Sequence, residues 1–146
     1  HTSWVDFFVG LMVRSILGEK INFVGKKELF TPYFGWFFRL LGGIPIDRSG
    51  SGGSVQSIIK LFKENKKFRI ALAPEGTRKK VKQLKTGYYH IAQELKIPIV
   101  PVTFDYTNKK IIVYPSFYST NNKFMDLKKL ETLFRGFNGF SKAKSF

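Results

Sequence analysis

The stretch FRIALAPEGTR, residues 68–78, joins an apolar segment directly to a polar turn. Residues 68–73 are almost continuously apolar, which is typical of a strand buried in a parallel sheet. Ligands of open α/β proteins bind at the carboxyl ends of such strands. The stretch therefore predicts both an α/β fold and a binding site formed by the residues that follow the strand, namely Glu75, Gly76, Thr77 and Arg78.

Two residues of this turn suit an anionic ligand. Gly76 has no side chain and allows backbone amides to approach an anion closely. Arg78 carries a guanidinium, which can bind a phosphate through two parallel hydrogen bonds. Taken alone, however, the turn is better explained as a polar link between a strand and a helix.

Apolar periodicity predicts a regular alternation of helices and strands along the chain. Helices are expected over residues 4–17, 31–41, 54–65, 86–96 and 126–134. Strands are expected over residues 21–25, 44–47, 68–73, 97–104 and 111–114. This order predicts one α/β domain over residues 1–146, a sandwich in which helices flank a central mixed, largely parallel sheet, with 136–146 as a loosely held tail.

Composition favours an anionic partner. The 146 residues include 25 Lys and Arg against 10 Asp and Glu, a net charge of +15. Such an excess suits nucleic acid, phosphate ligands, an acidic protein or an anionic membrane. The absence of Cys excludes disulfides, thiol chemistry and thiolate metal sites. No apolar run approaches the roughly 20 residues that span a bilayer.

The chain begins HTSWVD, which places a histidine five residues before an aspartate. On one helix the two side chains would point about 140° apart, so His1 can meet Asp6 only from a turn that precedes the helix. Ser3 provides such a start, because its spacing from Asp6 resembles a capping box. The simpler alternative is a helix cap behind an ordinary terminal histidine. Since the first residue is not Met, we expect the natural N-terminus to lie upstream.

Four segments share a known order and spacing. HTSWVD has the form HxxxxD, and it is followed by GGIPIDR (42–48), APEGTR (73–78) and IPIVPV (97–102). From His1 to about Val102 the chain resembles the 1-acylglycerol-3-phosphate acyltransferase family, whose members carry four such blocks. Lys85 and Gly87 also match a Lys-x-Gly pattern of that family. Ala73 stands where Phe is usual and Pro45 where an aromatic residue is common, so the resemblance leaves the acyl-chain contacts open.

The resemblance implies a set of site residues and roles. His1 would act as the general base, with Asp6 orienting its imidazole. Arg48, Arg78 and the backbone at Gly76 would bind the phosphate of the acceptor. The remaining substrate-binding residues would be Glu75, Thr77 and Pro101. No metal ion and no cofactor are implied, since the acyl thioester is a co-substrate.

The resemblance also implies partners and a location. The acceptor would be a lysophosphatidic-acid-like lysophospholipid and the product phosphatidic acid, while the donor would be acyl-CoA or acyl carrier protein. We expect association with an anionic membrane surface at its cytoplasmic face, and no nucleic-acid partner. Two alternatives remain: acylation of glycerol-3-phosphate, another lysophospholipid or a lipid-linked amino acid, or a non-enzymatic basic module that binds anionic membrane or nucleic acid.

Two further features have ordinary explanations. The consecutive aromatics Trp36, Phe37 and Phe38 suit a core, but one helix cannot turn all three inward, so at least one should meet an edge, a partner or lipid. His90, the only other histidine, is expected to serve in packing or at the surface.

Overall fold

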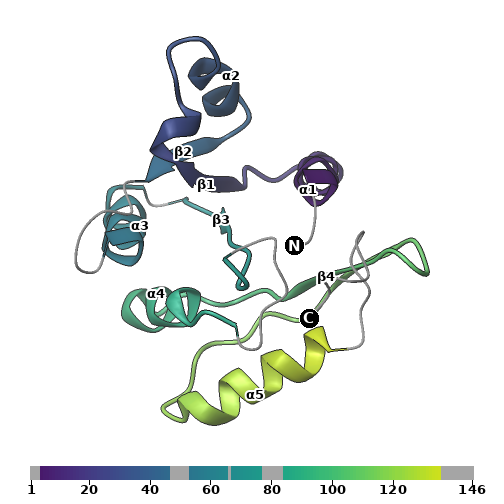
Figure 1. Cartoon of the computed structure of the whole chain (residues 1–146). Coiled ribbons are helices and arrows are strands. Elements are labelled where there is room, and N and C mark those ends of the chain that lie inside the picture. Colours follow the sequence, from purple (N-terminus) through teal and green to yellow (C-terminus); the bar gives the residue numbers. More distant parts are fainter. Residues whose placement is uncertain (1–3, 47–52, 66, 77–83, 136–146) are drawn as a thin grey trace. The chain divides into compact units, whose positions relative to one another are not determined.

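The computed structural model describes residues 4–46, 53–65, 67–76 and 84–135 (Figure 1). These residues form two compact units, one made of His1–Val9 with Ala73–Phe146 and the other of Gly10–Leu72. Helix α1 (Trp4–Leu17) begins in the first unit and ends in the second. The expectation of one acyltransferase domain over 1–146 stays a prediction, and each unit is described by itself below.

The Gly10–Leu72 unit contains a parallel sheet with strand order β2-β1-β3. Strand β1 (Asn22–Lys26) pairs in parallel with β2 (Gly43–Ile46) and with β3 (Ile70–Ala71). The predicted α/β class is thereby confirmed. β3 is much shorter than the strand expected over 68–73, because only two of its residues pair with β1 and it lies at the edge of the sheet.

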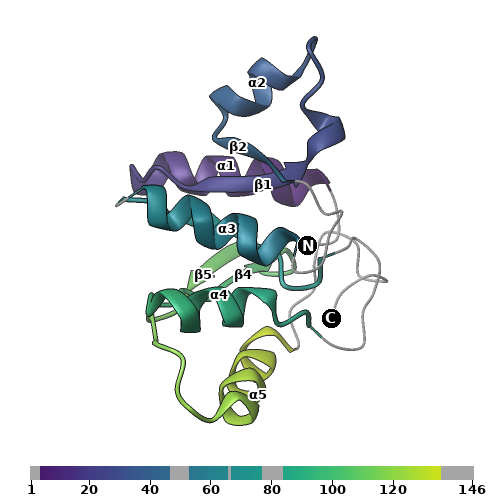
Figure 2. The ribbon, with the colours of Figure 1, turned by 90° about the vertical axis from the view of Figure 1, so that its left-hand side faces the viewer.

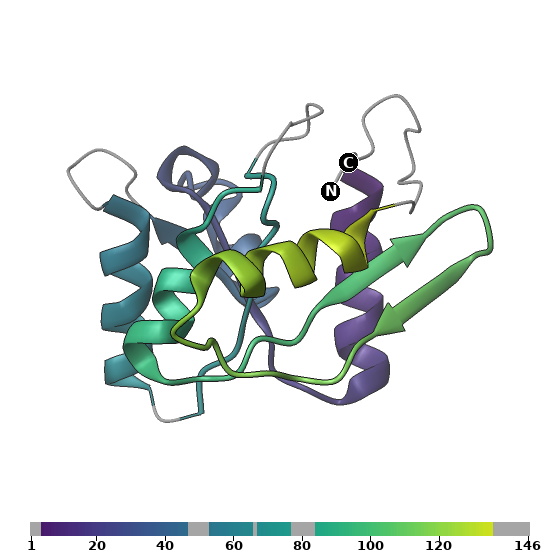
Figure 3. The ribbon, with the colours of Figure 1, turned by 90° about the horizontal axis from the view of Figure 1, so that it is seen from below.

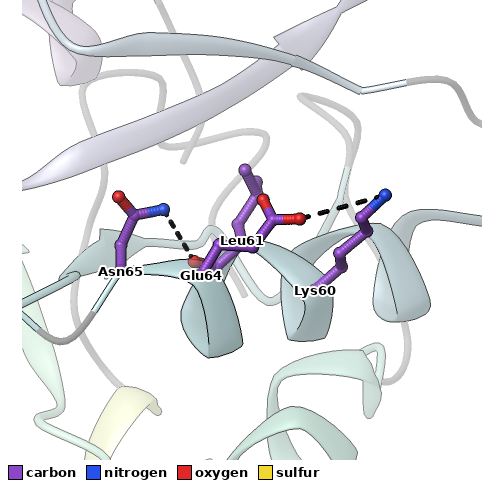
Figure 4. A network of polar contacts seen from close by, with 4 residues as sticks. All are labelled: Lys60, Leu61, Glu64 and Asn65. Carbon is purple, nitrogen blue, oxygen red and sulfur yellow. Dashed lines mark hydrogen bonds and ion pairs between the residues drawn. The ribbon is translucent and has the colours of Figure 1, made fainter.

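Helices lie on both sides of this sheet. Figure 2 shows α3 (Gly53–Glu64) in front of the strands and α1 behind them. The amphipathic pattern of α3 turns Ile58 and Ile59 inward, where both are almost fully buried. At its end, Lys60 Nζ lies 3.9 Å from a carboxylate oxygen of Glu64, and the Asn65 amide donates to the carbonyl of Leu61 at 2.9 Å (Figure 4). That amide satisfies one of the carbonyls that a helix end leaves unpaired.

Arg14 ties the end of α1 to the sheet. Its Nη1 donates to the carbonyl of Leu41 at 2.5 Å and to that of Ile21 at 3.2 Å. Gly42, with φ +83°, makes this approach possible, since a β-carbon there would lie 2.9 Å from Arg14 Nη1. These two hydrogen bonds hold the segment that leads into β2 close to the residue that precedes β1.

Helix α2 (Gly35–Leu40) is shorter than predicted. Thr31 accepts hydrogen bonds through its carbonyl from Gly35 N and through its hydroxyl from Phe34 N, but residues 32–34 form turns before the helix begins. A short 3-10 helix, η1 (Lys27–Leu29), precedes them. Trp36 and Phe37 are exposed, whereas Phe38 packs against Phe30, so the helix does not turn all three aromatics inward. That one of them meets an edge, a partner or lipid stays a prediction.

The other unit carries an antiparallel hairpin of β4 (Val102–Asp105) and β5 (Lys110–Val113), with helices α4 (Gly87–Leu95) and α5 (Lys123–Phe134) (Figure 3). Among the described residues, these strands form a sheet of their own rather than part of the parallel one.

The strand expected over 97–104 begins only at Val102. Pro98 and Pro101 have no amide hydrogen to donate to a ladder. Within residues 97–101, all of which the structure describes, Ile99 forms an isolated bridge to Phe117.

Helices α4 and α5 are joined by a buried polar cluster. Tyr89 is fully buried, and its hydroxyl lies 3.1 Å from Asp126 Oδ2 and 2.9 Å from the carbonyl of Thr120. Asp126 Oδ2 also accepts from Thr120 N at 2.6 Å. The Asn122 side chain caps α5 by accepting from Met125 N, which explains why the helix begins at Lys123, three residues before the predicted start.

Candidate active site

The structure describes half of the predicted site residues. Asp6, Glu75, Gly76 and Pro101 all belong to the unit formed by His1–Val9 and Ala73–Phe146, although they are far apart in sequence. His1, Arg48, Thr77 and Arg78 lie outside the described residues, and the roles assigned to them stay predictions.

Asp6 occupies the first turn of α1 and is almost fully buried, with 6% of its surface exposed. Tyr106 donates its hydroxyl to Asp6 Oδ1 at 2.6 Å, across 100 residues of sequence. A distance this short is typical of a hydrogen bond from a hydroxyl to a carboxylate. Burial, followed by the bond to Asp6 and the negative charge of Asp6, raises the pKa of Tyr106 well above its usual value, so the phenol keeps its proton.

Tyr106 is presented by a turn that has its own support. The Asp105 carboxylate accepts from the backbone amides of Thr107 and Asn108, both at 3.1 Å, and from the Asn108 side chain at 2.7 Å. The bonds from Asn108 are the main cause of the lowered pKa of Asp105, against the opposing effect of burial. Lys109 completes the turn in the left-handed region, with φ +53°. The hairpin turn is therefore held closed independently of the Tyr106 hydroxyl.

The predicted anion-binding turn is folded back on the Lys-x-Gly segment. Gly76 N donates to the carbonyl of Ala73 at 3.0 Å, and Lys85 N donates to that of Pro74 at 2.8 Å. The Lys85 side chain crosses Gly76, since a β-carbon there would lie 2.8 Å from Lys85 Cδ and 3.1 Å from its Nζ. Gly76 also has φ +63°, so both its conformation and this close approach favour glycine.

Glu75 and Pro101 occupy sheltered positions in the same unit. Glu75 is half-buried, and its Oε2 is shielded from solvent. Pro101 is buried, and its carbonyl accepts from Tyr114 N at 2.9 Å, just before β4 begins. Pro101 thus helps to set the start of the strand that leads to Asp105 and Tyr106. Its part in substrate binding stays a prediction.

Sequence reasoning missed Tyr106. No motif contains it, and the only local signal is a hydroxyl-bearing aromatic within DYTN, a turn-forming segment after a strand. The Lys-x-Gly pattern contains Lys85 but predicts no role for it. His90 is exposed, with Lys123 Nζ 3.0 Å from its Nε2, which confirms a surface position.

These contacts define two chemical features. The first is a buried carboxylate, Asp6, held at one oxygen by a phenol, which is an arrangement able to orient an imidazole. The second is a turn with a left-handed glycine, Gly76, and the ammonium of Lys85 close beside it, which is suited to an anion.

Comparison with known proteins identifies the family of this chain. The model of the acyltransferase family matches residues 1–105. Over 141 residues the chain is 33% identical to the 1-acyl-sn-glycerol-3-phosphate acyltransferase of Saccharomyces cerevisiae. This match covers 91% of this chain and 45% of the yeast protein. The enzyme of the same name from Escherichia coli is 37% identical over 95 residues, covering 60% of this chain and 38% of that protein. The chain thus spans less than half the length of these two relatives.

The fold also matches a solved structure. The crystal structure of the 1-acyl-sn-glycerophosphate (LPA) acyltransferase PlsC from Thermotoga maritima superposes with a TM-score of 0.56 at 21% identity. The match covers 79% of this chain and 54% of that one, and it supports the α/β fold. Because the family match extends over more than two thirds of the sequence, the chain belongs to the acyltransferase family.

Proposed function

We propose that this chain is the catalytic part of an O-acyltransferase that moves a fatty acyl group from a thioester to the free hydroxyl of a lysophosphatidic-acid-like acceptor, giving phosphatidic acid. The observation that carries the proposal is the family match over residues 1–105, together with relatives named as 1-acyl-sn-glycerol-3-phosphate acyltransferases. The buried position of Asp6 supports it, because this is the residue that would orient the base.

The proposed reaction needs a base because a hydroxyl is a poor nucleophile at neutral pH. The acceptor oxygen bonds to the thioester carbonyl carbon while its proton passes to the His1 imidazole. Collapse of the tetrahedral intermediate then breaks the carbon–sulfur bond, and the imidazolium returns the proton to the departing thiolate. Asp6 selects the tautomer of His1 and stabilises the imidazolium, as the carboxylate does in hydrolase triads.

We expect positively charged side chains, together with the backbone at Gly76, to bind the acceptor phosphate. Arg48 and Arg78 are the arginines of the second and third blocks. Lys85 adds a third cation, and the proximity of its ammonium to Gly76 supports this role. Holding the phosphate at a fixed place would bring the free hydroxyl to His1, which is catalysis by orientation.

Work on lipids would require contact with a membrane surface. None of the helices described here is long and apolar enough to cross a bilayer. We define the α2 face as the exposed apolar residues in and just before α2, which are Tyr33, Phe34, Trp36, Phe37 and Leu40. Arg39, Lys26 and Lys27 lie in or near α2 and are also exposed.

We propose that the α2 face and these cations bind the anionic cytoplasmic leaflet. Each Lys or Arg near such a surface contributes about 1 kcal/mol, so a few are enough for peripheral attachment. The net charge of +15 supports this location. It is equally compatible with an acidic acyl carrier protein as donor, so both donors belong in the assay.

The decisive experiment is an acyl-transfer assay on the natural full-length protein. Lysophosphatidic acid, glycerol-3-phosphate and other lysophospholipids should be offered with acyl-CoA or with acyl carrier protein thioester. We expect thioester-dependent formation of phosphatidic acid, abolished by His1→Ala in a protein that still folds. Near-normal turnover by that variant would refute the base assignment, and preference for another acceptor would correct the substrate. Failure with every acceptor would favour a non-enzymatic basic module.

A further inference from the structure

The contact between Tyr106 and Asp6 assigns a further residue to the site. We infer that Tyr106 is a positioning residue, which holds the Asp6 carboxylate in the orientation that His1 needs. The inference rests on the proposed function, because Asp6 matters for catalysis only if His1 is the base. Tyr106 itself lies one residue beyond the region that the family model matches.

The geometry of the contact is that of a restraint. A carboxylate turns easily about its last torsion, which is broad and roughly two-fold. The Tyr106 hydroxyl, 2.6 Å from Oδ1, holds one oxygen and so restrains rotation of the carboxylate. Tyr106 donates from the turn between β4 and β5, whereas Asp6 belongs to α1. The bond therefore sets the carboxylate relative to a second structural element of the same unit.

The surrounding structure argues against a purely architectural role. The turn that carries Tyr106 is closed by three hydrogen bonds to the Asp105 carboxylate, so its shape does not depend on the phenol. Asp6 is in the first turn of a 14-residue helix, where the helix dipole already favours a carboxylate. Both elements have support of their own, and the bond acts directly on the Asp6 carboxylate.

Removing the hydroxyl should therefore affect turnover more than binding. Tyr106→Phe keeps the ring and deletes only the donor. We expect kcat to fall roughly ten-fold, the change expected for loss of one hydrogen bond to a charged group. The KM values for acceptor and donor should stay within about two-fold of wild type, because Tyr106 is assigned no contact with either substrate.

Tyr89→Phe is a matched control. Tyr89 also bonds a buried aspartate, Asp126, in the same unit, but that cluster joins α4 to α5 and does not involve Asp6. This variant should lower the melting temperature and leave kcat unchanged once the protein is folded. Comparing the two variants distinguishes the general effect of losing a buried tyrosine–aspartate hydrogen bond from the specific effect on kcat of losing the bond to Asp6.

The assay should use the full-length protein, with circular dichroism to confirm folding. A kcat for Tyr106→Phe within two-fold of wild type would overturn the inference, as would an equal fall in Tyr89→Phe. If Tyr106→Phe melts at the assay temperature, the comparison should be repeated in the cold with an osmolyte that favours the folded state. A wild-type protein that acylates no acceptor would instead refute the proposed function, and the role of Tyr106 with it.

Discussion

The side chain of Lys85 lies directly against the Cα of Gly76. A β-carbon on Gly76 would be 2.8 Å from Lys85 Cδ, 3.0 Å from Cε and 3.1 Å from Nζ. Since Lys85 N also donates to the carbonyl of Pro74, both the backbone and the side chain of Lys85 are placed against this turn. Residues 73–76 and Lys85 therefore form one structural feature, in which the absence of a side chain on Gly76 leaves room for the positively charged side chain of Lys85.

Gly76→Ala should reduce acyl transfer by more than its cost in stability explains. The substitution forces a left-handed conformation on alanine, at roughly 1–2 kcal/mol, and it pushes the Lys85 side chain away from the turn. We expect the KM for a phosphorylated acceptor to rise several-fold. Initial rates over a range of acceptor concentrations will measure this, alongside urea unfolding.

Gly18→Ala provides the control. Gly18 has nearly the same conformation, with φ +65°, but a β-carbon there would meet nothing within 4 Å. It should lose similar stability and keep the wild-type KM. Equal effects of the two variants on KM would show that Lys85 does not contribute to acceptor binding.

Arg78→Ala tests the phosphate assignment derived from the sequence. A guanidinium–phosphate contact contributes on the order of 1.5–3 kcal/mol, the range for hydrogen bonds to charged groups. The apparent affinity for lysophosphatidic acid should therefore fall roughly ten- to a hundredfold. An acceptor that lacks a phosphate should be affected much less. Equal losses for both acceptors would contradict a specific role in phosphate binding.

Asp105 should make the stability of the protein sensitive to acid. The Asn108 side chain, with the backbone amides of the turn, lowers the pKa of Asp105 in the folded state. The resulting stabilisation is present above the unfolded pKa, near 3.8, and is lost as the pH falls below it. In urea unfolding at neutral pH, wild type should therefore have a larger free energy of unfolding than Asp105→Asn. The difference should shrink in acid. A difference independent of pH would refute this account.

Three tyrosines should resist ionisation in the folded protein. Burial raises the pKa of Tyr88 to about 12, with a further contribution from Glu131, and it also raises the pKa values of Tyr89 and Tyr106. The neutral phenols contribute stability below the unfolded pKa of 10, and this contribution is lost as the pH rises through the folded values. As the pH is raised, phenolate absorbance should appear at a higher pH in the native protein than in the denatured chain. In Tyr106→Phe this difference in pH between the native and the denatured protein should decrease. An unchanged difference would contradict the environment described for Tyr106.

The sequence predicted local structure well where a periodic pattern coincided with burial. In α3 the apolar spacing that includes Ile58 and Ile59 gave the helix almost to its ends. It failed where backbone chemistry interrupted a hydrophobic run, as at Pro98 and Pro101, which postpone β4 to Val102. The sequence-based prediction was also wrong at α5, where the Asn122 cap starts the helix three residues earlier in the chain.

The site divides in a similar way. Glu75 and Gly76 could be proposed from the sequence because they belong to a contiguous motif that occurs in order with three other segments. Tyr106 could not be, because its partner Asp6 is 100 residues away and no periodic pattern records a contact between two single side chains. Lys85 was visible as part of a pattern, but its position against Gly76 depends on how the intervening backbone folds.

Membrane attachment is the remaining prediction, and its two contributions are separable. The α2 face offers large exposed apolar groups, among them Trp36 at 64% and Leu40 at 74% exposure. Insertion of these groups would be driven by burial of apolar area, which salt does not screen. Attraction of the lysines and arginines to anionic lipid is screened, with a Debye length of about 8 Å at roughly 0.15 M salt.

Sedimentation with vesicles should therefore give a specific pattern. Wild type should bind vesicles of anionic phospholipid strongly and neutral vesicles weakly, and its binding should fall steeply as salt rises. A Trp36→Ser, Leu40→Ser double variant should weaken binding at every salt concentration, because it removes apolar area. It removes no charge, so the steepness with which binding falls as salt rises should not change. Arg39→Gln removes a charge and no apolar side chain, so its binding should depend less steeply on salt concentration. If wild type binds neutral and anionic vesicles equally and salt has no effect, the net charge of +15 serves another partner, most simply an acidic acyl carrier protein.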